Sequence, residues 1–251
     1  MRILIVGEIP FADTLAGLCR AKNHKVDLFI AEALEDQDTL DRMVRAATRC
    51  QVAIESLNES QSGKLWLVEG LEANIPAEVP LLVSALAASA TEIASWTEHP
   101  ARVVGYGLLP PISTTGLVEF VPAMQTDFEQ ALQARRFWEQ LDFGVVRVQD
   151  APGLVRPRII CSVINEAVRT LMQSAISVED LDIAMQLGMN YPRGPLRWAD
   201  EIGLDVVIGT LEAMQRHWGA ERYHPAPLLR QKVLAGHLGR KTGRGFYTYS
   251  A

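Results

Sequence analysis

The first stretch with residue types suited to binding chemistry is Gly7-Glu-Ile-Pro-Phe-Ala12, directly after the first apolar run of the chain. A glycine where a strand turns into a helix lets the pyrophosphate of a dinucleotide approach backbone N–H groups at the helix N-terminus. Gly7 supplies the first position of G-x-G-x-x-G and Ala12 an accepted third. Ile9 stands at the second, where a branched side chain obstructs the phosphates, and Glu8 adds negative charge. Gly7 is the candidate cofactor-binding residue of this turn, and a purely structural turn is the favoured alternative.

Other residue types that could bind a cofactor or a metal do not occur at the expected positions or spacings. The acid that should end the second strand and hold the adenosine ribose is replaced by Ile30 or a neighbour. The five histidines and three cysteines are scattered, without metal-ligand or CxxC spacing, so neither a metal site nor a disulfide framework is predicted.

Composition limits the class of protein. Hydrophobic residues make up 48% and charged residues 22% of 251, which is typical of globular proteins. A net charge of −6 offers no basic surface for nucleic acid or anionic membrane, so we expect neither partner. The apolar N-terminus is too short for a signal peptide or a membrane span, which favours a cytoplasmic location.

Seven short apolar or β-branched runs predict strands that must position the Gly7 turn. They cover residues 2–7, 25–30, 51–55, 79–84, 101–105, 117–121 and 144–148. Helical spacing fills most of the intervals, and β–α alternation implies parallel strands joined by right-handed crossovers. Residues 1–150 are therefore expected to form a Rossmann-like, doubly wound, mostly parallel α/β domain.

A linker with a Pro-Gly pair, Gln149-Asp-Ala-Pro-Gly153, marks the predicted domain boundary. Beyond it the strand signal disappears, and apolar residues at helical spacing predict a long helix after Pro157. Ser177 followed three residues later by Asp180 has the capping-box arrangement of a second helix. Further helices are expected over 204–214 and 227–238, so residues 151–251 form an all-α C-terminal domain.

Several ordered motifs carry a family resemblance. They are Pro152-Gly-Leu-Val155, Ile164-Asn-Glu-Ala-Val168, Val178-Glu-Asp-Leu-Asp182, Ala184-Met-Gln-Leu-Gly188, Tyr191-Pro-Arg-Gly-Pro195 and Gly239-Arg-Lys-Thr-Gly-Arg-Gly-Phe-Tyr247. In these motifs the chain resembles the NAD-dependent 3-hydroxyacyl-CoA dehydrogenases, including the 3-hydroxybutyryl-CoA enzymes. It is most similar to the degenerate second module of two-module bacterial enzymes.

The resemblance implies an altered catalytic set. The family's acid/base histidine falls on Gly107, whereas the glutamate that orients it is retained as Glu119, the candidate catalytic residue. The substrate-binding serine falls on Leu86, and an asparagine falls on Pro157. The stretch between the second and third strands also leaves no room for the helical pair that contacts coenzyme A in the family.

Other family positions are retained. Glu59, Lys64 and Lys241 match residues that lie near the cofactor in the family, so the resemblance implies NAD contacts for all three. The alternatives are a solvated helix start for Glu59 and Lys64 and a surface lysine in a glycine-rich turn for Lys241.

Three functions remain open from the sequence. The favoured hypothesis is a non-catalytic member of the family that forms a homodimer, or a heteromer with an active dehydrogenase, through residues 151–251. The second is an active NAD-dependent 3-hydroxyacyl-CoA dehydrogenase. The third is a protein that binds an acyl-CoA between its domains without chemistry.

Overall fold

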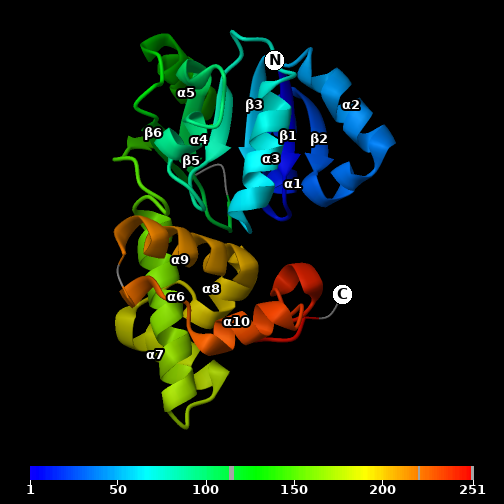
Figure 1. The fold of residues 1–251 in the computed structure, drawn as a ribbon. Coiled ribbons are helices and arrows are strands. Elements are labelled where there is room, and N and C mark those ends of the chain that lie inside the picture. Colours follow the sequence, from blue (N-terminus) through cyan, green and yellow to red (C-terminus); the bar gives the residue numbers. More distant parts are fainter. Residues whose placement is uncertain (113–115, 220, 250–251) are drawn as a thin grey trace.

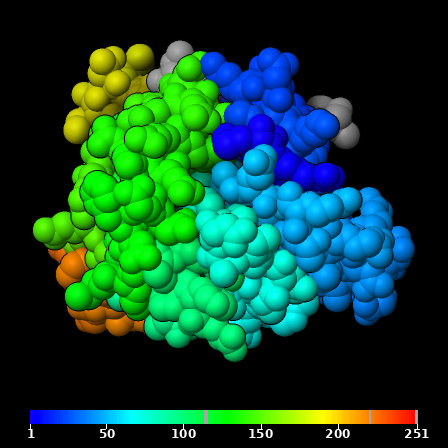
Figure 2. Space-filling model, turned by 90° about the horizontal axis from the view of Figure 1, so that it is seen from above, coloured from blue at the N-terminus to red at the C-terminus, as the bar shows by residue number. Residues whose placement is uncertain are grey.

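The structure is a computed structural model that describes residues 1–112, 116–219 and 221–249. Its N-terminal part is a sheet covered by helices, and its C-terminal part is a helical domain at the carboxyl ends of the parallel strands (Figure 1). Seen from above, the blue, cyan and green segments form most of the surface (Figure 2).

The sheet of the N-terminal domain has the strand order β2-β1-β3-β4-β5-β6-β7. Neighbouring strands are parallel except for β5 and β6, which are antiparallel. This confirms the predicted doubly wound, mostly parallel sheet. The strands are β1 (Arg2–Gly7), β2 (Lys25–Ile30), β3 (Val52–Ser56), β4 (Leu81–Ser84), β5 (Val103–Gly107), β6 (Leu117–Pro122) and β7 (Gly144–Arg147).

Alternation along β1 explains why helices cover both faces. Ile3 and Ile5 pack with α1 and α5, whereas Leu4 and Val6 pack with α2, α3 and α4. A strand buried on both faces needs a continuous apolar run, which is the pattern that predicted it. The helices are α1 (Phe11–Ala21), α2 (Gln37–Ala47), α3 (Gln61–Glu72), α4 (Ala90–Ala94) and α5 (Phe128–Gln140), with short 3-10 turns η1 (Ala31–Glu35) and η2 (Pro100–Arg102).

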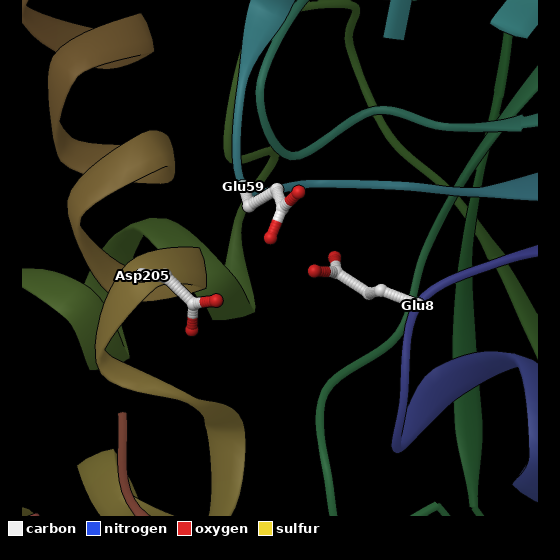
Figure 3. A group of neighbouring side chains, drawn as sticks. All are labelled: Glu8, Glu59 and Asp205. Atoms are coloured by element: carbon white, nitrogen blue, oxygen red, sulfur yellow. The ribbon is translucent and has the colours of Figure 1, made fainter. Parts of the chain in front are cut away.

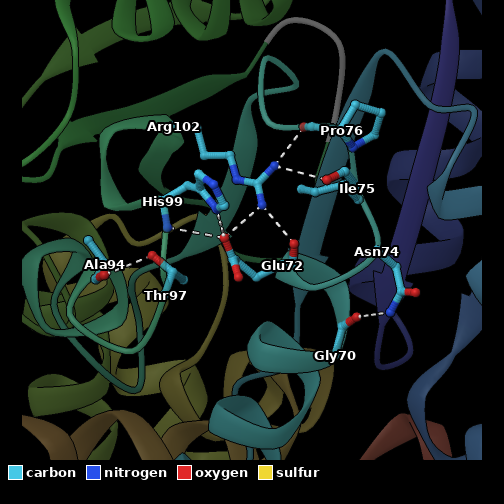
Figure 4. A network of polar contacts seen from close by, with 9 residues as sticks. All are labelled: Gly70, Glu72, Asn74, Ile75, Pro76, Ala94, Thr97, His99 and Arg102. Carbon is cyan, nitrogen blue, oxygen red and sulfur yellow. Dashed lines mark hydrogen bonds and ion pairs between the residues drawn. The ribbon is translucent and has the colours of Figure 1, made fainter.

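A buried arginine closes the C-terminal end of α3 (Figure 4). The Arg102 guanidinium donates to the carbonyl oxygens of Glu72, Ile75 and Pro76 at 2.7, 3.1 and 2.6 Å. It also pairs with the Glu72 carboxylate at 2.8 Å, and His99 contacts the same carboxylate. The last carbonyls of a helix lack partners within the helix, so these bonds stabilise the α3 terminus.

The C-terminal domain is helical, as predicted. It contains α6 (Arg156–Gln173), α7 (Val178–Met189), α8 (Pro195–Ile202), α9 (Leu204–Trp218) and α10 (Pro227–Leu234), with turns η3 (Glu221–Tyr223) and η4 (Arg240–Thr242). α6 begins at Arg156 and so includes Pro157, after which the helix was predicted to begin, because proline is tolerated in the first turn. The predicted cap is confirmed: Ser177 Oγ accepts from Asp180 N at 3.0 Å. Helix α8 was not predicted.

The glycine-rich C-terminal motif wraps around the buried carboxylate of Asp200. That carboxylate accepts from the backbone N–H groups of Phe246 and Tyr247 at 2.8 and 2.9 Å and from the Tyr249 hydroxyl at 3.0 Å. A Cβ on Gly245 would lie 1.9 Å from Asp200 Oδ1, so only glycine allows this approach. The motif therefore has a packing role that requires no ligand.

Asp182 in α7 has the same kind of packing role as Asp200 in α8. Its carboxylate accepts from the N–H groups of Leu196 and Arg197 at 2.8 and 2.9 Å and caps α8. A Cβ on Gly194 would lie 2.0 Å from Asp182 Cγ, which explains the glycine of Tyr191-Pro-Arg-Gly-Pro195. Across the described residues, none of the helices combines the length and apolar character needed to cross a membrane.

Candidate site between the two domains

The strand order reverses between β1 and β3, which is where open α/β sheets bind their ligands. Gly7 ends β1 and lies against Ser56 of β3. A Cβ at Gly7 would come within 2.1 Å of Ser56 Oγ and 2.8 Å of the Ser56 carbonyl oxygen. Close packing of the two strands is enough to require this glycine, which favours the structural alternative for Gly7.

Glu8 follows directly and is only 2% exposed. Its Oε1 accepts from Asn58 N at 2.6 Å, and its own carbonyl oxygen accepts from Ala12 N in the first turn of α1 at 2.9 Å. Pro10, before α1, has no N–H to donate. The N–H groups of Asn58 and Ala12 are thus used by the chain itself, and position 10 has none to offer.

Three carboxylates meet above this turn: Glu8 after β1, Glu59 after β3 and Asp205 in the first turn of α9 (Figure 3). One oxygen from each lies within 4.8 Å of the others. We call these three residues the carboxylate cluster. The Lys241 ammonium pairs with Asp205 Oδ2 and lies 3.9 Å from Glu8 Oε2. Lys241 is thus an interdomain ion-pair partner, not a surface lysine.

Burial and mutual repulsion change how the cluster titrates. Burial raises the pKa of Glu8 to about 8, and Asp205 and Glu59 add to this rise while Lys241 opposes it. Burial also raises the pKa of Glu59 against the effect of Lys241. Burial alone would lower the pKa of Lys241, but Asp205, Glu8 and Glu59 outweigh it and raise that pKa.

The residues at this turn do not fit the pyrophosphate of a dinucleotide. The phosphates need free N–H donors and positive charge, whereas the turn presents a buried glutamate and two further carboxylates. Helix α9 also approaches closely, because a Cβ at Gly209 would lie 2.5 Å from the Asn58 carbonyl oxygen. The C-terminal domain therefore covers part of the loop after β3, beside a hollow of about 360 Å³ that Glu32, Glu59 and Trp66 help to line.

Lys64 lies in α3 and is wholly buried. Its Nζ contacts Glu55 Oε2 at 2.5 Å and donates to the Leu57 carbonyl oxygen at 2.8 Å. The ammonium is thus held inside the domain by β3 and the loop that follows it. These contacts give Lys64 a structural role inside the sheet domain.

Glu119 and Gly107 are directly opposite one another on β6 and β5, as the family pattern implies. Both carboxylate oxygens of Glu119 accept backbone hydrogen bonds, from Val155 N at 3.1 Å and Arg156 N at 2.6 Å. A Cβ at Gly107 would lie 2.5 Å from Leu154 Cδ1. Glu119 therefore caps α6, and Leu154 fills the place of the missing histidine side chain.

The two other altered positions are also filled by packing. Leu86 is wholly buried in the hydrophobic core of the C-terminal domain, together with Phe11 and Leu109 from the sheet domain. Pro157 is buried in the first turn of α6. Hollows along the domain junction are small, with volumes of about 230 and 210 Å³. A larger one of about 620 Å³ lies between β6, β7 and α5 and contains none of the predicted site residues.

Sequence reasoning singled out Glu59 and Lys241 but not their partner Asp205. Glu8 was noted only as unfavourable charge, and the role of Leu154 was missed. No local pattern marks Asp205, since an acid in a first helical turn is common. Only the packing of α9 on the sheet domain brings it to Glu8.

Comparison with known proteins agrees with this architecture. The model of the 3-hydroxyacyl-CoA dehydrogenase NAD binding domain matches residues 14–151, and that of the C-terminal domain matches residues 153–249. A probable 3-hydroxybutyryl-CoA dehydrogenase of Bacillus subtilis is 35% identical over 84% of this chain and 74% of its own length. The chain belongs to the 3-hydroxyacyl-CoA dehydrogenase family.

Solved structures show the same likeness along the whole chain. The (S)-3-hydroxybutyryl-CoA dehydrogenase PaaH1 of Ralstonia eutropha has a TM-score of 0.76 at 26% identity, covering 100% of this chain and 99% of that one. FadB2 of Mycobacterium tuberculosis has a TM-score of 0.81 at 26% identity, covering 99% of both chains.

Proposed function

We propose that this chain is a non-catalytic member of the 3-hydroxyacyl-CoA dehydrogenase family. The observation that carries the proposal is the set of hydrogen bonds that Glu119 accepts. The glutamate that would orient a catalytic histidine instead bonds two backbone amides of α6, and Leu154 occupies the space beside Gly107. General acid–base catalysis needs a titratable group within hydrogen-bond reach of the reacting hydroxyl, and this pair supplies none.

The cofactor turn supports the same proposal. Glu8, Glu59 and Asp205 place carboxylates where a dinucleotide would bring its phosphates. By Coulomb's law such like charges repel, and more strongly when they are partly removed from water. We therefore propose that NAD does not bind at this turn.

The role left to the chain is that of a dimerisation or partner subunit acting through residues 151–251. Apolar side chains remain exposed on α6 and α7, among them Ile159, Ile183 and Leu187, the last being 83% exposed. Ile183 and Leu187 are four residues apart and so share one face of α7. Exposed apolar patches of this kind mark association surfaces.

Catalysis is tested with the purified chain, acetoacetyl-CoA and NADH, following NADH absorbance, with an active 3-hydroxybutyryl-CoA dehydrogenase as positive control. We expect no turnover and no heat when NAD is titrated by calorimetry. Turnover at the ordinary enzymatic rate of ~1 per second or more would refute the proposal and support an active dehydrogenase. Saturable acyl-CoA binding without NADH oxidation would instead favour an acyl-CoA-binding protein.

Association is tested by sedimentation equilibrium of the wild type and of Leu187→Asp. A charge on the shared face of α7 should weaken self-association at least tenfold, because it would be buried without a partner. The matched control is Leu234→Asp, an equally exposed leucine on α10. An equal effect of both variants, or a monomeric wild type that also fails to bind an active homologue, would contradict the partner role.

A further inference from the structure

The carboxylate cluster contains three acids, and among the described residues one ammonium, that of Lys241, forms ion pairs with them. Glu8, Glu59 and Asp205 carry three formal negative charges when ionised, against one positive charge on Lys241. Two of the three side chains are more than nine-tenths buried, with exposures of 2% for Glu8 and 7% for Asp205. Buried charges in proteins are normally paired or coordinate a metal.

The two buried carboxylates share one arrangement. One oxygen of each is held by the protein: Glu8 Oε1 accepts from Asn58 N, and Asp205 Oδ2 pairs with Lys241. The other oxygen of each, Glu8 Oε2 and Asp205 Oδ1, is buried and has no hydrogen-bond partner among the described residues. Orphaned buried polar atoms are rare, and here two of them belong to one cluster.

Figure 3 shows the three side chains converging from separate elements on one point. Their nearest oxygens lie within 4.8 Å of one another. An ion with metal–oxygen distances of about 2.3–2.6 Å joins three mutually equidistant oxygens that are about 4.0–4.5 Å apart, so the three carboxylates need to approach one another only slightly to share one ion. In metal sites, contacts to the non-coordinating oxygen orient a carboxylate ligand, and Glu8 and Asp205 both have such a contact.

We propose that Glu8, Glu59 and Asp205 form a binding site for one divalent cation that prefers oxygen ligands, such as Ca²⁺ or Mn²⁺. The ligands are Glu8 Oε2, which lies 3.9 Å from Lys241 Nζ but accepts no hydrogen bond, Asp205 Oδ1 and the exposed Glu59 carboxylate, and water completes the coordination shell. Lys241 stays on Asp205 Oδ2. The ion joins the loops after β1 and β3 to α9 and so ties the sheet domain to the helical domain.

The test titrates Mn²⁺ into the full chain at pH 7 by calorimetry. We expect one site with a dissociation constant of ~10⁻⁵ to 10⁻³ M. Glu59→Gln, an exposed change that leaves the fold intact, should weaken binding at least tenfold. Lys241→Met should tighten it, since a nearby positive charge is lost.

The matched control is Glu35→Gln, which removes an exposed acid outside the cluster and should leave Mn²⁺ affinity unchanged. Glu8→Gln removes a ligand and should also weaken Mn²⁺ binding; if this variant fails to fold, Glu59→Gln still decides the question. Absence of saturable binding, or equal weakening by Glu59→Gln and Glu35→Gln, would overturn the proposal. In that case Lys241 alone balances the cluster. Neither result depends on catalytic activity.

Discussion

At the scale of single residues, the Glu119 carboxylate accepts hydrogen bonds from the N-terminus of α6 and has no histidine to orient. The first amides of α6 lack partners within the helix, and the Val155 cap position has no side-chain cap of its own. The negative charge also interacts favourably with the positive end of the α6 dipole. A residue matched to catalysis by family position is thus accounted for by structure alone.

Restoring the histidine should therefore not restore activity. We expect Gly107→His to lower the free energy of unfolding by about 1–3 kcal/mol, because the new side chain overlaps Leu154. We also expect no NADH oxidation with acetoacetyl-CoA. The double variant Gly107→His/Leu154→Ala relieves the overlap and should still be inactive, since Leu86 remains apolar. Measurable turnover by either variant would show that the remaining site is competent.

Lys64 gives a second prediction at this scale. Lys64→Met should lower the free energy of unfolding by about 3–5 kcal/mol in a denaturant titration, because Glu55 is then buried without its partner. The double variant Glu55→Gln/Lys64→Met removes the stranded charge and should recover a large part of this loss. If Lys64 served mainly to contact a cofactor, Lys64→Met would leave stability near that of the wild type.

At the scale of elements, glycines of the C-terminal motifs should differ according to what surrounds them. Gly245→Ala should lower the free energy of unfolding by about 1–3 kcal/mol, since a Cβ there overlaps the Asp200 carboxylate. Gly188→Ala is the matched control, because Gly188 lies in α7 with nothing within 4 Å of its missing Cβ. It should gain about 0.5–1 kcal/mol from helix propensity. Equal effects in thermal unfolding would contradict the packing role.

Most elements could be predicted from apolar periodicity, because buried strands and amphipathic helices leave local patterns. Helix α8 could not, since its first amides are capped by Asp182 from a different helix. The same limit applies to the site. Gly7, Glu59 and Lys241 were found by position in a motif, whereas Asp205 joins them only through the packing of α9 against the sheet domain.

At the scale of the whole molecule, the interface between the domains contains both apolar packing and charge. Leu86, Phe11 and Leu109 of the sheet domain enter the core of the helical domain. Trp198 of α8 donates from Nε1 to the Pro110 carbonyl oxygen at 2.9 Å. The carboxylate cluster and Lys241 lie at the same junction. Apolar contacts are insensitive to pH, so the cluster determines how the junction responds to it.

The stability of the molecule should therefore depend on pH through Glu8. Its folded-state pKa of about 8 lies above the ordinary value of 4.5, so the folded chain binds this proton more tightly. The contribution of Glu8 is complete below pH ~4.5 and is lost as the pH rises through about 8, with a slope of at most about 1.4 kcal/mol per pH unit.

Glu8→Gln removes this titration while preserving the shape of the side chain. In urea titrations between pH 5 and 9 with a chelator present, the wild type should lose stability relative to Glu8→Gln as the pH rises. Carboxylates outside the cluster titrate alike in both proteins, so the difference reports on Glu8 and its interactions with Glu59, Asp205 and Lys241. If the stability of the wild type relative to Glu8→Gln stayed constant across this range, or fell as the pH was lowered, Glu8 would be ionised in the folded chain. Lys241 would then neutralise the junction at every pH tested.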